Sequence, residues 1–215
     1  MRILIRLIAA LALAGVALPA AAQDKVRLLL DWFVNPDHAA LVIAKQRGIF
    51  TKHGLDVELI APADPNAPPK LVAAGQAEYA LSYQPTLQML AAEGLPLVRV
   101  GVLVAQPLNS LVALEDGPVK TIADFKGRKI GYSIAGFEEA LLGAILEKAG
   151  LTLKDVTLIN VNFALTTALM SKQVDGVIGA FRNFELNDLE INKTKGRIWL
   201  VEKHGEAGRI AEQLK

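Results

Sequence analysis

Residues 30–38 read Leu30-Asp31-Trp32-Phe33-Val34-Asn35-Pro36-Asp37-His38 and join two elements of different hydrophobic period. The apolar run before them, residues 26–30, is typical of a buried strand, and residues 39–44 after them continue as a helix. Asn35 and Pro36 favour a helix start, because Asn caps free backbone N–H groups and Pro suits the first helical position. The stretch therefore predicts a strand-to-helix turn, which is the connection that recurs throughout an α/β fold.

Four side chains in this turn are suited to binding a flat polar ring: Asp31, Trp32, Asn35 and His38. Ligands of open α/β sheets bind at the carboxyl ends of the strands, which is where this turn is expected to lie. An indole can stack on a ring, and an acid, an amide and an imidazole can bond to its edge. The alternative is a capped helix beside a half-buried tryptophan, and the turn by itself does not decide between the two.

Strand and helix patterns alternate along the rest of the chain. This alternation predicts mostly parallel sheets flanked by helices, and residues 97–104 are expected to form one of the strands. Residues 74–82 and 171–179 share the order helix end, Gln, acid and buried strand, which indicates two similar lobes. The expected division is a signal peptide at 1–22, a first lobe at 23–106, a hinge crossover at 107–114, a second lobe at 115–201 and a divergent tail at 202–215.

Residues 1–22 have the three parts of a cleavable secretory signal peptide: Arg2 and Arg6 at the start, the apolar run 7–18, and small residues at 19–22. The apolar run is short for a membrane span. The chain contains no cysteine, which excludes a disulfide framework, a thiolate metal site and a lipidated cysteine anchor. We expect a periplasmic protein of a double-membraned bacterium, and simple secretion is the alternative.

Charge and motif content argue against several classes of function. The formal net charge is +1 at pH 7, and loss of the two leader arginines leaves the rest close to neutral. Nucleic-acid binding requires a basic surface, so no nucleic-acid partner is expected. The sequence contains no Gly-x-Ser-x-Gly elbow, no metal-spaced cluster of His, Asp and Glu, and no phosphate-binding glycine loop. Neither a metal nor a catalytic residue is predicted.

Longer segments resemble a known family. They are Asp31-Trp32 with Asn35-Pro36-Asp37-His38, Arg47-Gly48-Ile49-Phe50, His53-Gly54-Leu55-Asp56-Val57, Ala73-Ala74-Gly75-Gln76-Ala77-Glu78, Ser82-Tyr83-Gln84-Pro85, Gln106-Pro107-Leu108-Asn109-Ser110, Lys126-Gly127-Arg128-Lys129-Ile130-Gly131-Tyr132, Gln173-Val174-Asp175-Gly176-Val177-Ile178-Gly179-Ala180 and Phe181-Arg182-Asn183-Phe184-Glu185. With them the chain resembles the type II periplasmic binding proteins that bind thiamine pyrimidine precursors, and the related thiamine pyrimidine synthases of fungi.

The resemblance implies a two-lobed clamp that closes on an aminopyrimidine, a hydroxymethyl- or formylamino-pyrimidine, and delivers it to an ABC permease. Sulfonate, nitrate or taurine binding is the alternative, because several of the segments recur in those binders. The candidate ligand-binding residues are Asp31, Trp32, Asn35, His38, Tyr83, Asn109 and Glu185. Trp32 and Tyr83 are expected at neighbouring strand tips, where they would sandwich the ring, and the polar side chains would bond to its edge. Tyr83 could equally be core, Asn109 a hinge residue and Glu185 a solvated side chain.

The second alternative is the synthase itself. The resemblance places the synthase's pyridoxal-phosphate lysine on Ser82 and its reacting histidine on Thr86. Ser82 cannot form a Schiff base and Thr86 has no imidazole, so we expect no enzyme and no cofactor.

In the family the chain returns from the second lobe to complete the first. This chain ends at Lys215, so a C-terminally truncated product with an incomplete first lobe is expected.

Overall fold

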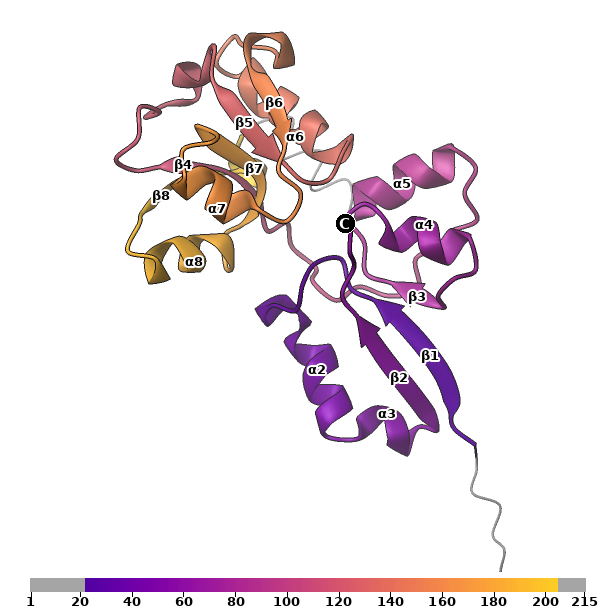
Figure 1. The fold of residues 1–215 in the computed structure, drawn as a ribbon. Helices are drawn as coiled ribbons and strands as arrows, with labels where there is room; N and C mark the ends of the chain where they lie inside the picture. The colour runs from indigo at the N-terminus through magenta and orange to yellow at the C-terminus, as the bar shows by residue number, and fades with distance from the viewer. Residues whose placement is uncertain (1–21, 205–215) are drawn as a thin grey trace, which may run out of the picture.

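The computed structural model describes residues 22–204, which fold into two α/β lobes with a β-sheet in each (Figure 1). All but the last residue of the predicted signal peptide, and residues 205–215 of the predicted tail, lie outside the described residues. Within residues 22–204, no helix is both long enough and apolar enough to cross a membrane. The two-lobed α/β architecture expected from the sequence is confirmed.

The first lobe is built on a parallel three-stranded sheet. Its elements are β1 (Asp24–Leu29), η1 (Pro36–His38, a 3-10 helix), α2 (Ala39–Gln46), α3 (Ile49–Lys52), β2 (Leu55–Ile60), α4 (Pro68–Ala73), β3 (Tyr79–Ala80) and α5 (Gln84–Ala92). The strand order is β2-β1-β3, with Val26 opposite Val57 and Leu28 opposite Tyr79. Figure 1 shows α4 and α5 on the side of this lobe that faces the second lobe.

The second lobe has a five-stranded sheet in the order β6-β5-β7-β4-β8. Its elements are β4 (Asn109–Leu114), η2 (Ile122–Phe125), β5 (Lys129–Tyr132), α6 (Phe137–Glu147), η3 (Leu153–Asp155), β6 (Thr157–Asn160), α7 (Leu165–Met170), β7 (Gly176–Phe181), α8 (Glu185–Ile191), β8 (Gly196–Leu200) and η4 (Val201–Lys203). β5 pairs in parallel with β6 and β7, whereas β4 runs antiparallel to β7 and β8.

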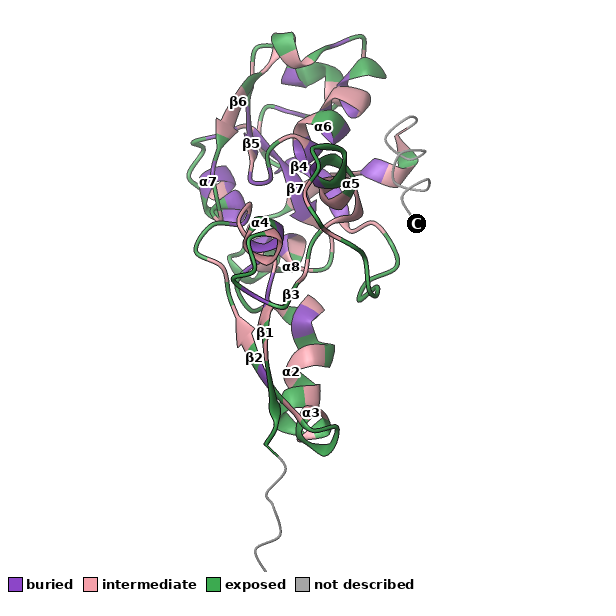
Figure 2. Cartoon of the chain, turned by 90° about the vertical axis from the view of Figure 1, so that its right-hand side faces the viewer, coloured by how far each residue is buried: buried purple, intermediate pink, exposed green. Residues whose placement is uncertain are grey.

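The hydrophobic core lies mainly in the second lobe, where buried residues gather on β4, β5 and β7 (Figure 2). All six residues of β4 are buried, and its four apolar residues alternate between two clusters as the two-residue period of a strand requires. Leu111 and Ala113 pack on the face that α6 covers, and Val112 and Leu114 pack on the face that α7 and α8 cover. The sheet is therefore covered by helices on both faces.

Two boundaries differ from the sequence prediction. Residues 97–104 are extended but belong to no sheet, and Val98 is 82% exposed. A strand needs a neighbour for its backbone groups, and the described residues supply none to this segment. The hinge crossover predicted at 107–114 overlaps β4, because six of its residues pair with β7 and β8. In the structure, residues 93–108 connect α5 to β4.

Candidate functional site between the two lobes

The turn after β1 is held by its own hydrogen bonds. The Asn35 side chain accepts a bond of 2.9 Å from the Asp37 N–H, and Pro36 occupies the first position of η1. The Asn35 N–H donates in return to Nδ1 of His38 at 3.2 Å. The two bonds form a capping box at the N-terminal end of η1, which is why this short sequence folds as predicted.

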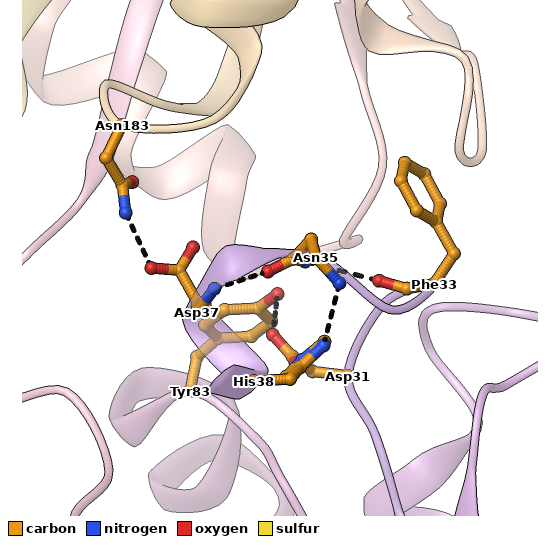
Figure 3. A network of polar contacts seen from close by, with 7 residues as sticks. All are labelled: Asp31, Phe33, Asn35, Asp37, His38, Tyr83 and Asn183. Atoms are coloured by element: carbon orange, nitrogen blue, oxygen red, sulfur yellow. Dashed lines mark hydrogen bonds and ion pairs between the residues drawn. The ribbon is translucent and has the colours of Figure 1, made fainter. Parts of the chain in front are cut away.

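Asp31 is the centre of a hydrogen-bond network in this turn (Figure 3). The Asn35 N–H can only donate, so Nδ1 of His38 accepts this bond and Nε2 is the ring nitrogen that can donate. Nε2 therefore donates to Oδ1 of Asp31 at 2.9 Å, and the Tyr83 hydroxyl donates to Oδ2 at 2.8 Å. Each carboxylate oxygen retains a second lone pair that can accept a ligand N–H.

The network keeps the Asp31 carboxylate ionised. Burial raises its pKa, but the hydrogen bonds from His38 and Tyr83 outweigh burial and lower the pKa below the usual aspartate value. Burial first, and then the Asp31 charge, raise the pKa of Tyr83 well above its ordinary value. Tyr83 therefore remains a hydrogen-bond donor, and Asp31 remains a charged acceptor.

The two predicted aromatic residues do not form an open sandwich. Trp32 is 6% exposed and packs edge-on against Phe163 of the second lobe, with ring centroids 4.8 Å apart. Tyr83 stacks on Phe137, also of the second lobe, at 5.7 Å and 23°. In this arrangement each ring is covered by an aromatic residue of the opposite lobe, and the stacking of a ligand ring between Trp32 and Tyr83 stays a prediction.

The second lobe contributes two buried carboxyl groups, Glu138 and Glu185. Oε2 of Glu138 accepts from the Ser133 and Ile134 N–H groups at 2.7 and 3.1 Å, and Oε2 of Glu185 accepts from the Phe181 N–H at 2.6 Å. Burial raises the pKa of Glu138 to about 8 and that of Glu185 to about 7, although these backbone hydrogen bonds act to lower both pKa values. Glu138 is therefore largely protonated at neutral pH, whereas Glu185 becomes largely protonated only below pH 7.

A glycine makes room for the Glu138 carboxyl. Gly179, in β7, has φ +95°, a conformation that L side chains rarely adopt. A Cβ at this position would collide with the carboxyl group of Glu138. The glycine in the middle of β7 therefore allows a carboxyl to lie against the strand backbone.

Two spaces lie at the junction of the lobes, and both are lined by Asp31 and Tyr83. The smaller, here called the inner pocket, has a volume of about 10 Å³. It is lined by Asp31, Trp32, Asn35, Tyr83, Glu138, Leu165, Gly179, Phe181, Phe184 and Glu185. The larger, here called the side cavity, has a volume of about 140 Å³. It is lined by Asp31, Pro65, Asn66, Pro69, Lys70, Leu81, Ser82, Tyr83, Thr86, Met89, Leu90, Glu93, Ile134 and Ala135.

Hydrogen bonds between the lobes hold them closed around these spaces. The Asn66 amide donates to the Ser133 carbonyl and accepts from the Ala135 N–H, both at 3.0 Å. The Asn183 amide donates to the Asp37 carboxylate at 2.6 Å, reaching it from the second lobe (Figure 3). The structure is therefore a closed form of the two-lobed fold.

The candidate residues divide into two groups. Five line the inner pocket: Asp31, Trp32, Asn35, Tyr83 and Glu185. His38 lines neither space; it is 1% exposed and orients Asp31 from behind. Asn109 lines neither space, and its amide donates to the Gly179 carbonyl at 3.4 Å, joining β4 to β7.

Sequence reasoning missed Glu138 and Asn66. Two adjacent acids at the start of a helix, Glu138 and Glu139, are usually solvated, so Glu138 gave no local signal. The glycine inside the strand at 179 was the available hint that another group approaches closely. Asn66 lies in a proline-rich loop, where a polar residue is ordinary. Among the described residues, no group of three His, Asp or Glu side chains is arranged to hold a metal ion.

The family model described as NMT1/THI5 like matches residues 35–214. A Haemophilus influenzae protein named for thiamine biosynthesis is 54% identical over 188 residues, covering 87% of this chain and 60% of the relative. The formylaminopyrimidine-binding protein of Halalkalibacterium halodurans is 35% identical over 164 residues, covering 76% of this chain and 50% of the relative. A Legionella pneumophila 4-amino-5-hydroxymethyl-2-methylpyrimidine phosphate synthase is 26% identical over 168 residues, covering 78% of this chain and 52% of the relative. The chain thus spans about half to three-fifths of the length of these relatives.

Among solved structures, the alkanesulfonate-binding protein of Xanthomonas axonopodis pv. citri, bound to MOPS, superposes with a TM-score of 0.65. The identity is 19%, and the match covers 82% of this chain and 60% of that one. At this identity the likeness shows the fold, which is that of the periplasmic binding proteins.

Proposed function

This chain belongs to the NMT1/THI5-like family, and from that premise we propose that it binds a thiamine pyrimidine precursor as the solute-binding component of an ABC importer. The ligand is a hydroxymethyl- or formylamino-pyrimidine, in line with the name of the Halalkalibacterium relative. The site of action is the periplasm, which the predicted signal peptide and the binding-protein fold support. The protein passes its ligand to a permease in the inner membrane.

The observation that carries this proposal is the ionised Asp31 within a pocket of aromatic and carboxyl side chains. Three carboxyl groups, those of Asp31, Glu138 and Glu185, line the inner pocket, and its lining residues include no Lys, Arg or His. A carboxylate accepts N–H bonds, and a protonated carboxyl can donate to a ring nitrogen. An aminopyrimidine presents both kinds of group on one edge.

The same charges argue against a sulfonate or nitrate ligand. An anion would face the negative Asp31 in a site of low dielectric, where like charges repel strongly. The similarity to an alkanesulfonate-binding protein therefore supports the clamp-like fold and not that protein's ligand. Binding of a taurine-type ligand would contradict the proposal.

A binding role without catalysis is supported by two side chains. Ser82 and Thr86, where the resemblance places the synthase's lysine and histidine, both line the side cavity. Neither supplies an amine for a Schiff base nor an imidazole. The family also includes synthases, so the absence of turnover belongs to the proposal and requires its own measurement.

Ligand entry requires the lobes to separate. The inner pocket of about 10 Å³ has room for about one water molecule, which needs about 10–15 Å³. A pyrimidine ring can enter the inner pocket only when the lobes separate, which breaks the bonds of Asn66 and Asn183 across them. Closure on the ring would then exclude water from the Asp31 carboxylate.

Titration calorimetry on the mature protein tests the proposal. The panel contains 4-amino-5-hydroxymethyl-2-methylpyrimidine, its formylaminomethyl analogue, taurine and nitrate. We expect both pyrimidines to bind, and neither the sulfonate taurine nor nitrate to bind. Asp31→Asn should weaken pyrimidine binding about tenfold or more, because hydrogen bonds to charged groups are worth about 1.5–3 kcal/mol. Tight binding of taurine without pyrimidine binding would overturn the proposal. To test for synthase chemistry, the protein is incubated with pyridoxal phosphate and its mass is then measured by mass spectrometry. We expect no mass loss that would indicate consumption of a histidine side chain.

A further inference from the structure

The side cavity is not explained by binding of a ring at the inner pocket. Its volume of about 140 Å³ compares with the roughly 10–15 Å³ that a water molecule needs, so it can accept a group of several heavy atoms. It lies between α4 and α5 of the first lobe and the loop at Ile134 and Ala135 of the second. Asp31 and Tyr83 form the wall that it shares with the inner pocket.

One residue that lines the side cavity, Thr86, carries a buried hydroxyl group with no hydrogen-bond partner among the described residues. Oγ of Thr86, in the first turn of α5, is shielded from solvent and bonds to no other described atom. Leaving a buried hydroxyl unpaired destabilises a protein, so such groups are rare away from functional sites. Thr86 is one of the residues that line this space, so a ligand group held there would lie beside the hydroxyl.

We propose that the side cavity receives the 5-substituent of the aminopyrimidine, and that the Thr86 hydroxyl selects a short, uncharged polar substituent by hydrogen bonding to it. The inference rests on the proposed function and goes beyond it by naming the part of the ligand that this cavity recognises. In a 4-amino-5-substituted pyrimidine, the amino group and the substituent are on adjacent ring atoms. An amino group at Asp31 therefore directs the substituent to the neighbouring space, whose wall Asp31 also forms.

The charges around the cavity favour an uncharged substituent. Lys70 and Glu93, of opposite charge, are both exposed and line the cavity, and neither forms an ion pair with another described residue. The deeper wall carries the negative Asp31, which would repel a phosphate. A hydroxymethyl or formylaminomethyl group meets these conditions, and both can bond to a hydroxyl.

The test compares Thr86→Val with the unsubstituted protein, because valine keeps the shape of threonine and removes the hydroxyl. Calorimetry uses three ligands that differ at the 5-position only: hydroxymethyl, formylaminomethyl and methyl. We expect the first two to bind Thr86→Val roughly three- to tenfold more weakly, as loss of one neutral hydrogen bond predicts, and the methyl compound to bind unchanged. The melting temperature of the free variant should be unchanged or higher, because the variant loses an unpaired buried hydroxyl.

Thr167→Val is the matched control. Thr167 is exposed in α7, its hydroxyl donates to the Ala164 carbonyl at 3.3 Å, and it lines neither the side cavity nor the inner pocket. The Thr167→Val substitution should leave the affinity for all three ligands unchanged. Equal affinities of Thr86→Val and the unsubstituted protein for the polar ligands would overturn the cavity assignment while leaving the proposed function intact. Equal weakening for all three ligands would also overturn it, since the ring itself would then contact Thr86. Failure of the unsubstituted protein to bind any pyrimidine would overturn both proposals.

Discussion

The indole ring of Trp32 packs edge-on against Phe163 with ring centroids 4.8 Å apart, although the first residue follows β1 of the first lobe and the second belongs to the other lobe. Trp32 is counted among the core residues of the second lobe, together with Val112 and Leu165. A side chain of one lobe thus completes the hydrophobic core of the other. Closure of the lobes and formation of the candidate site are therefore coupled through one residue.

Replacement of Trp32 should affect both binding and stability. Trp32→Ala removes the buried ring from the junction, and large-to-small changes of this kind cost about 3–5 kcal/mol in a packed core. We expect ligand affinity to fall on the order of a hundredfold or more and the free protein to unfold at a lower temperature, with Trp32→Phe intermediate in both. Calorimetry and thermal denaturation measure the two effects.

Trp199→Ala is the control for Trp32. Trp199, in β8, packs against Phe125 at 5.7 Å, within the second lobe and away from the junction. It should lower the melting temperature without a selective loss of affinity at temperatures where the variant is folded. Unchanged affinity in Trp32→Ala would show that the indole serves only in packing.

His38 should act on the ligand through Asp31. In His38→Ala, the Asp31 carboxylate loses one of the bonds that hold its pKa low, so that pKa rises. Because a lowered carboxyl pKa preserves the charged form as the pH falls, the variant should lose ligand binding at a higher pH than the unsubstituted protein does. Affinity measured from pH 3.5 to 7 tests this, and at neutral pH we expect roughly a tenfold loss.

His38→Gln should restore part of this function, because the glutamine amide can donate to Asp31. His53→Ala, at an exposed position after α3, should leave the pH profile unchanged. A profile of His38→Ala that coincides with that of the unsubstituted protein would exclude a positioning role.

Glu138 should make the protein less stable at alkaline pH. Its pKa is raised from 4.5 to about 8 by burial, so the folded state holds a proton that the unfolded state releases above pH 4.5. The stabilisation is complete below pH 4.5 and is lost as the pH rises toward 8. We expect the free energy of unfolding to fall by roughly 2–4 kcal/mol between pH 5 and 8.5, since one pKa unit corresponds to about 1.4 kcal/mol.

Glu138→Gln should flatten this part of the stability curve, because glutamine keeps an oxygen for the Ser133 and Ile134 N–H groups and does not ionise. Glu147→Gln, at an exposed position in α6, should retain the slope of the unsubstituted protein. Denaturant unfolding at several pH values measures the difference. A slope that is the same in Glu138→Gln and the unsubstituted protein would assign the pH dependence to other groups.

The hydrogen bonds of Asn66 should stabilise the closed form. Asn66→Ala removes two bonds between the lobes, worth about 1 kcal/mol each, so the ratio of closed to open molecules should fall roughly thirtyfold. The radius of gyration from small-angle scattering, without ligand, should increase. Asn192 follows α8, and its amide bonds to Asp188 of that helix and to no other residue among 22–204, so Asn192→Ala should leave the radius unchanged. An unchanged radius in Asn66→Ala would mean that packing alone keeps the lobes together.

The local features of this protein follow from its sequence. The strand-to-helix turn after β1 was predicted because Asn35 and Pro36 determine a helix start through bonds within a few residues. Alternating strand and helix patterns likewise predicted parallel sheets flanked by helices, since hydrophobic period reflects how each element packs against its sheet. Residues 97–104 show the limit of this reasoning, because a strand-like pattern does not supply a partner strand.

The candidate site was decided by tertiary structure. The sequence places Asp31 and Tyr83 at the ends of strands, but only the packing of β1 beside β3 brings the Tyr83 hydroxyl to 2.8 Å from Asp31. The approach of Glu138 to Gly179, 41 positions later in the chain, depends on how α6 lies over β7. Closure of the lobes then buries Trp32 and Tyr83 against rings of the other lobe. Capping and period are properties of neighbouring residues, whereas burial, pKa and the shape of a pocket depend on groups that only the folded chain brings together.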